Sequence, residues 1–142
     1  MITYKQYTNL PNEYISKKID EFLTEDIPNN DITTQSTISS SCYITAKIYA
    51  GDNLIFAGNK IISNCFDTNC TISLNYKDGE LIKKGDVIGE IKGLSEDILS
   101  KERVMLNLIQ RLCGIASLSN KYAKIAKPFN VKILDTRKTT PG

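Results

Sequence analysis

A run of hydroxyl and cationic side chains near residue 140 is the part of this sequence best suited to chemistry. It comprises Thr136, Arg137, Lys138, Thr139 and Thr140. Arg137 offers a planar fork of donors that matches a carboxylate or a phosphate, and Lys138 offers a compact positive charge. Such a cluster suits a small ligand with several negative charges. A solvated basic turn is the alternative, and composition alone does not separate the two.

The run directly follows Val131–Asp135, whose residues favour a β-strand. In open α/β sheets and in α/β barrels, ligands bind at the carboxyl ends of the strands. We therefore expect Val131–Asp135 to be a strand that presents Thr136, Arg137 and Lys138 to a ligand.

A second pair of charged residues, Glu102 and Arg103, lies on a predicted helix. Apolar residues recur at helical spacing and define one face: Ile98, Leu99, Met105, Leu106, Ile109, Leu112, Cys113 and Ala116. By this register Glu102 points into the apolar face and Arg103 lies at its edge. A buried carboxylate needs a partner, so helix geometry favours a structural ion pair between Glu102 and an arginine.

Composition excludes several classes of function. The chain has 142 residues, 41% of them hydrophobic and 24% charged, which fits one ordinary globular domain. The net charge of +2 gives no basic field for nucleic acid or an acidic membrane. No apolar run is long enough for a signal peptide or a membrane span, so we expect a cytoplasmic protein.

The sequence contains no histidine and four cysteines, at positions 42, 65, 70 and 113. The cysteine spacings match no zinc or redox motif, so we interpret them as unpaired thiols, and we predict no metal site within the chain. Without histidine, any chemistry must use lysine, arginine, aspartate or glutamate.

The remaining patterns predict a small antiparallel sheet with helices. We expect a helix over Asn12–Asp26 capped by Asn12, a half-buried strand over Cys42–Ala50, a short helix near Lys60–Phe66, a strand from Thr71 to Tyr76, a hairpin turn at Asp78-Gly79 and short strands between 81 and 91. The string DGELIKKGDVIGEI is similar to the strands of biotinyl and lipoyl carrier domains. The chain lacks the Met-Lys-Met that a carrier would place at a hairpin tip, so the string is interpreted as scaffold.

Four motifs, in order along the chain, resemble the quinolinate phosphoribosyltransferase family. ILDTRKTTPG resembles the signature that ends that family's first barrel strand, and ERVMLNLIQRLCGIAS resembles its ER-x-x-LN helix with the following SGIAT segment. Cys113 and Ser117 replace the usual serine and threonine of that segment. LTEDIPNNDITT and IFAG are similar to the shorter EDIGSGDITT and VLAG motifs. The resemblance covers nearly the whole chain.

The resemblance implies an α+β N-terminal sandwich, residues 1–112, followed by the first strand of a truncated α/β barrel, residues 113–142. It also implies a homodimer in which each sandwich covers the partner's barrel mouth. The family converts quinolinate and phosphoribosyl pyrophosphate, with Mg²⁺, into nicotinate mononucleotide, pyrophosphate and CO₂, in de novo NAD biosynthesis.

Residue by residue, the resemblance implies that Arg103 reaches the neighbouring subunit's site and binds a quinolinate carboxylate. Arg137 matches a second carboxylate-binding arginine, and Thr136 lines the quinolinate pocket. Lys138 matches a lysine near the phosphoribosyl and pyrophosphate groups, the one catalytic candidate of this chain. Glu102 orients the neighbouring arginine.

A closed α/β barrel needs about 250 residues, and the family's later lysine, His-Arg pair and acidic magnesium ligands do not occur here. We therefore expect a fragment that is inactive alone, with the Mg²⁺ ligands beyond this chain. Two alternatives stay open. One is a molybdenum-transport-associated relative of the same fold, whose motif usually reads TTRKTFPG; Asp135 and Thr140 favour the quinolinate enzyme. The other is a non-catalytic dimerisation module.

Overall fold

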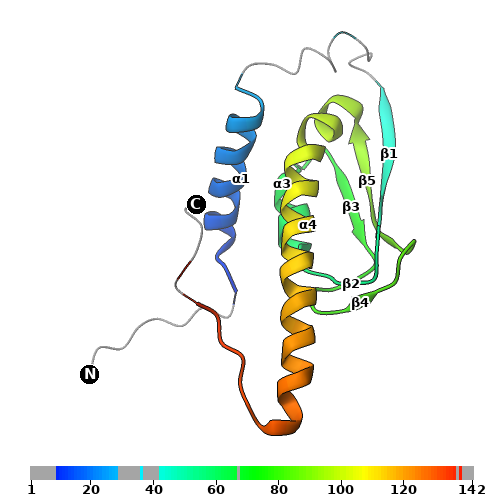
Figure 1. Cartoon of the computed structure of the whole chain (residues 1–142). Helices are drawn as coiled ribbons and strands as arrows, with labels where there is room; N and C mark the ends of the chain where they lie inside the picture. The colour runs from blue at the N-terminus through cyan, green and yellow to red at the C-terminus, as the bar shows by residue number, and fades with distance from the viewer. Residues whose placement is uncertain (1–8, 29–35, 37–41, 67, 137, 139–142) are drawn as a thin grey trace.

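The protein is an α+β sandwich, as the sequence predicted. The computed structural model describes residues 9–28, 36, 42–66, 68–136 and 138 (Figure 1). Its elements, in order, are α1 (Asn12–Asp26), β1 (Tyr43–Tyr49), β2 (Leu54–Ile55), α3 (Asn59–Cys65), β3 (Thr71–Leu74), β4 (Leu81–Ile82), β5 (Val87–Leu94), α4 (Ser95–Ala126) and the 3₁₀ helix η1 (Lys127–Phe129). The predicted motifs at 29–35 lie outside the described residues.

The strands form two small antiparallel sheets. β5 is the centre of a three-stranded sheet with the order β1-β5-β3, and β2 pairs with β4 in a two-stranded sheet. The Asp78-Gly79 segment does turn, with Gly79 at φ 92°. It connects β3 to β4, which belong to different sheets, so the hairpin prediction was wrong. A turn motif specifies a local reversal, whereas strand pairing depends on which apolar faces meet.

The helices cover one face of the sheets. α1, α3 and α4 lie on the same side, with α4 between α1 and the strands (Figure 1). The most deeply buried large side chains are Phe56, Ile19, Ile62, Ile82 and Ile91. Helix α1 has the predicted bounds, although Pro11 rather than Asn12 occupies the N-cap position. The predicted inward face of β1 is also confirmed, because Ile44 and Ala46 are half-buried while Ile48 is buried.

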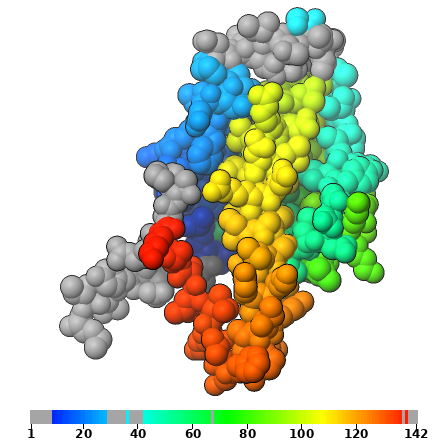
Figure 2. All heavy atoms as spheres, viewed as in Figure 1, coloured from blue at the N-terminus to red at the C-terminus, as the bar shows by residue number. Residues whose placement is uncertain are grey.

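Helix α4 is longer than the layer that it covers. It has 32 residues and continues past the lower end of α1 and of the sheets (Figure 1). Beyond Cys113 its large apolar side chains are exposed, namely Ile115, Leu118, Tyr122 and Ile125. Figure 2 shows this lower half of α4, in orange, standing clear of α1. No helix in the described part of the chain combines the length and hydropathy needed to cross a bilayer.

The predicted strand at Val131–Asp135 is absent. Residues 131–136 have no regular secondary structure and all are exposed. A parallel strand is stabilised by hydrogen bonds to neighbouring strands, and the sheets of the described residues place no strand beside this segment. The composition of Val131–Asp135 favours a strand, but the segment cannot form one without neighbouring strands.

Candidate functional site

Arg103 extends from the upper part of α4 into solvent and forms an ion pair with the end of α1. Its Nη1 lies 3.2 Å from Oδ1 of Asp26. The arginine side chain is 74% exposed, whereas the Asp26 side chain is 23% exposed. The two surfaces adjoin along this part of the molecule, α1 in blue and α4 in yellow (Figure 2). The guanidinium is therefore accessible to a ligand while it is held at one end.

A groove of about 330 Å³ between α1 and α4 lies next to this ion pair. Apolar side chains of Phe22, Val104 and Leu108 form part of its wall, together with Glu25, Asp26 and Asn107. Asp26 therefore belongs both to the groove and to the Arg103 ion pair. This connection was missed in the sequence, since Asp26 and Arg103 are 77 positions apart.

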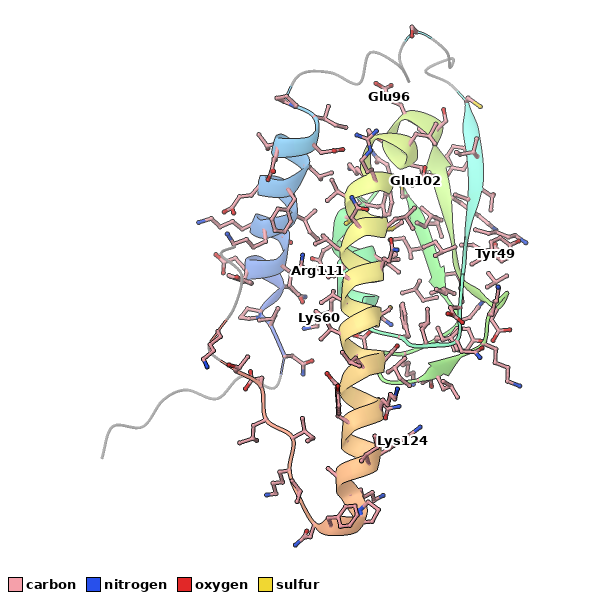
Figure 3. The ribbon with its side chains drawn as sticks, in the orientation of Figure 1. Tyr49, Lys60, Glu96, Glu102, Arg111 and Lys124 are labelled. Carbon is pink, nitrogen blue, oxygen red and sulfur yellow. The ribbon has the colours of Figure 1, made fainter. Side chains whose placement is uncertain are left out.

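Glu102 does not point into the core, which corrects the prediction from helix register. It is exposed, near the upper end of α4 (Figure 3). One turn further along, Leu106 lines an open groove of about 510 Å³ between α4 and the edge strand β1. Because the layer ends at β1, that flank of α4 remains open to water. Glu102 thus needs no buried partner.

The C-terminal candidates lie apart from this region. Thr136 and Lys138 are exposed, and the backbone N–H of Lys138 donates to Oγ1 of Thr136 at 3.2 Å. Arg137 lies outside the described residues. Neither groove described above has Thr136 or Lys138 in its wall. Neither of these two grooves therefore brings the predicted ligand-binding side chains together.

Two small side chains of α4 attach it to the segment around β2, a role that the sequence did not reveal. The Sγ atom of Cys113 accepts from the N–H of Ala57 at 3.3 Å, and Oγ of Ser117 accepts from the N–H of Ile55 at 2.8 Å. In the sequence, this role could have been inferred from two small polar residues, Cys113 and Ser117, four positions apart on an apolar helix face. Here they satisfy backbone donors that would otherwise be left without a partner.

The buried thiols are unsuited to nucleophilic chemistry. Burial raises the pKa of Cys65 to about 12, and burial also raises the pKa of Cys113. Both side chains therefore stay protonated at neutral pH, and the thiolate is the reactive form. The four cysteines, all among the described residues, form no disulfide with one another, and Cys42 is exposed whereas Cys65 and Cys113 are buried. In the described residues, no group of three or more cysteine, aspartate or glutamate side chains is arranged to hold a metal ion.

The family model described as quinolinate phosphoribosyl transferase, N-terminal domain, matches residues 31–113, more than half of the chain. The chain belongs to this family. A probable nicotinate-nucleotide pyrophosphorylase (carboxylating) from Bacillus subtilis is 44% identical over 132 residues, which are 90% of this chain and 45% of that protein. A protein with the same description from Archaeoglobus fulgidus is 35% identical over 82% of this chain and 45% of its own length.

A relative with a solved structure has the same fold. The nicotinate-nucleotide pyrophosphorylase of Francisella tularensis superposes with a TM-score of 0.89 at 33% identity, covering 98% of this chain and 50% of that one. The chain thus spans about half the length of the relatives that it matches. The match ends at residue 113, inside α4, which continues without a break to Ala126.

Proposed function

We propose that this chain is the N-terminal half of a quinolinate phosphoribosyltransferase that makes nicotinate mononucleotide. The main support for this proposal is the family match over residues 31–113. The fold also leaves the guanidinium of Arg103 exposed, so that it can reach a ligand. The protein acts in the cytoplasm as a homodimer. Its sandwich, residues 1–112, covers the barrel mouth of the partner, and residues 113–142 begin its own barrel.

In the proposed reaction the ring nitrogen of quinolinate bonds to the anomeric carbon of phosphoribosyl pyrophosphate, and the bond to pyrophosphate breaks. The bond from the ring to its adjacent carboxylate then breaks as CO₂ leaves, and water supplies a proton to that carbon. Arg103 and Arg137 bind the substrate carboxylates, because burying two anions requires fixed cations. Thr136 lines the pocket, and Lys138 stabilises the departing pyrophosphate. Glu102 supports Arg103 through its negative charge.

Mg²⁺ accompanies phosphoribosyl pyrophosphate in this proposal. No group of carboxylates among the described residues is arranged to hold the ion. We assign no magnesium-binding role to these residues, and no step performed by them depends on the ion.

The first test assays the purified 142-residue chain for pyrophosphate release from phosphoribosyl pyrophosphate that depends on quinolinate. We expect none, since Thr136 and Lys138 are exposed and the chain spans only about half the length of the relatives that it matches. Formation of nicotinate mononucleotide by this chain would show that the inactivity proposal is wrong.

The second test uses Arg103→Ala in the complete gene product. Loss of a charge-assisted hydrogen bond should raise the quinolinate dissociation constant about 10- to 100-fold. The constant for phosphoribosyl pyrophosphate should change less than about threefold, because the proposal places no contact between it and Arg103. Unchanged quinolinate affinity would contradict the assignment of Arg103.

A second candidate function follows from the exposed apolar side chains of α4. Ile115, Leu118, Tyr122 and Ile125 are each more than half exposed, and apolar surfaces of this kind mark interaction sites. The chain could then act as a dimerisation module without catalysis. Light scattering that shows a dimer, together with calorimetry that shows no binding of either substrate to the complete gene product, would favour this alternative.

A further inference from the structure

The C-terminal end of α1 carries negative charge where a helix tolerates it poorly. Its last two residues are Glu25 and Asp26, and its last turn contains no basic residue. The carbonyl end of a helix is the negative end of its dipole, so carboxylates there are disfavoured and cations are favoured. Residues that break a local stability rule often serve a functional site.

Asp26 has a specific tertiary contact that Glu25 is not seen to share. Its Oδ1 accepts from Nη1 of Arg103 at 3.2 Å, across the boundary between α1 and α4. The Asp26 carboxylate is three-quarters covered, whereas the arginine side chain is three-quarters exposed. A largely covered carboxylate therefore holds an exposed guanidinium by one of its amino groups.

Stability does not account for this arrangement. An ion pair whose arginine is mostly in solvent contributes little to folding, because water screens the attraction and the long side chain loses rotamer freedom. Holding that side chain in place does matter for binding. If the arginine is already ordered, less conformational entropy is lost when a ligand binds.

We propose that Asp26 is the positioning residue for Arg103. This inference rests on the proposed function, in which Arg103 binds a carboxylate of quinolinate. Asp26 occupies one donor of the guanidinium, which has five N–H donors, and so orients the remaining ones toward the ligand. Asp26 thus orients the arginine by direct contact, whereas the support proposed for Glu102 comes from its negative charge alone.

The test compares three variants of the complete gene product by calorimetric titration with quinolinate and with phosphoribosyl pyrophosphate. Asp26→Asn should weaken quinolinate binding about 3- to 10-fold, the loss expected when one side chain is no longer pre-ordered. It should leave the affinity for phosphoribosyl pyrophosphate within about twofold. Asp26→Glu restores the carboxylate and should recover most of the quinolinate affinity.

Glu25→Gln is the matched control, because it removes a carboxylate from the same helix end and from the same groove. It should leave both affinities unchanged. The thermal midpoint is the second measurement. Removing either charge from the C-terminal end of α1 should leave the midpoint unchanged or raise it, so Asp26→Asn should lose quinolinate affinity without losing stability.

The outcomes separate this inference from the function on which it rests. If Arg103→Ala weakens quinolinate binding and Asp26→Asn does not, the positioning role is wrong and the proposed function stands. If Arg103→Ala has no effect on quinolinate binding, both are overturned. If Asp26→Asn lowers the thermal midpoint and weakens the binding of both substrates equally, Asp26 contributes to stability alone. The positioning role is then again wrong.

Discussion

The two halves of α4 have the same secondary structure and opposite surroundings. In the first half, Ile98, Met105 and Ile109 are at most 5% exposed. In the second half, Ile115, Leu118 and Tyr122 are at least 53% exposed. Leu108, Ile115 and Tyr122 repeat by seven, so one stripe passes from the α1 interface into solvent beyond the lower end of α1 (Figure 1). Hydrophobic pattern thus marks what a helix can bury, and the neighbouring elements decide what it does bury.

The sharpest way to test this contrast is to truncate one large side chain in each region. Phe56 is fully buried in the core that α4 covers, and Tyr122 is 53% exposed on the second half of α4. Phe56→Ala should lower the free energy of unfolding by about 3–5 kcal/mol, because it removes apolar contacts and leaves a cavity. Tyr122→Ala should change it by less than about 0.5 kcal/mol. Urea unfolding followed by circular dichroism measures both.

If Phe56→Ala does not fold, Phe56→Leu provides a smaller truncation at the same site. If Tyr122→Ala lowered the free energy of unfolding as much as Phe56→Leu does, the lower half of α4 would be packed. The proposed difference between the two halves would then be wrong.

Substituting alanine for two glycines should give the next largest changes in the free energy of unfolding, and the two changes should have opposite signs. A Cβ atom added at Gly58 would lie 2.6 Å from Cγ2 of Ile109 on α4, whereas one added at Gly114 would meet nothing within 4 Å. Gly58→Ala should destabilise by about 1–3 kcal/mol through overpacking. Gly114→Ala should stabilise by up to about 1 kcal/mol, because alanine favours a helix interior. Thermal and urea unfolding of both variants would reveal whether the signs differ.

A smaller effect is expected where the packed half of α4 ends, at Ser117. Its Oγ accepts from the half-buried N–H of Ile55, so Ser117→Ala should cost about 1 kcal/mol in unfolding free energy. Ser117→Thr keeps the hydroxyl and should cost less. Ser119 is exposed on the same helix, and Ser119→Ala serves as the control, with no loss expected. Equal losses at 117 and 119 would mean that the hydrogen bond to Ile55 contributes nothing.

The last effect is a pH dependence that arises in the packed region. Burial raises the pKa of Cys65 from 9.0 to about 12. Below pH 9 the thiol is neutral in both the folded and the unfolded chain. Above pH 9 it ionises only in the unfolded chain, so its contribution favours unfolding increasingly as the pH rises toward 12. Cys65→Ala should therefore lose less of its thermal midpoint between pH 8.5 and 10.5 than the unmodified chain does.

An equal loss in the two proteins over that range would mean that Cys65 is not shielded. Alkylation at pH 8 provides an independent control, since exposed Cys42 should react before buried Cys65.

Local patterns predicted the elements whose partners are close in the fold. The bounds of α1 follow from apolar spacing and from Pro28, and the inward face of β1 follows from its alternation. The prediction for Glu102 was wrong because helix register gives an angle and not the width of the layer beneath it. The strand at Val131–Asp135 was wrong because strand formation depends on a neighbour that no local pattern supplies.

The candidate site shows the same division. The chemical character of Arg103, Thr136 and Lys138 was visible in their residue types and in the family motifs around them. The pairing of Arg103 with Asp26 was not, because it joins residues 77 positions apart. Which donors a guanidinium uses depends on what the folded chain places beside it.

By itself, the sequence determined the family, the class of fold and the helix and strand periodicities, since all of these depend on residue identity and short-range spacing. Only the tertiary structure decided that Asp26 meets Arg103, that Glu102 faces water and that α4 is buried along only part of its length. The physical reason is that burial and ion pairing depend on the finite extent of the neighbouring elements, which the chain sets only when distant segments pack together.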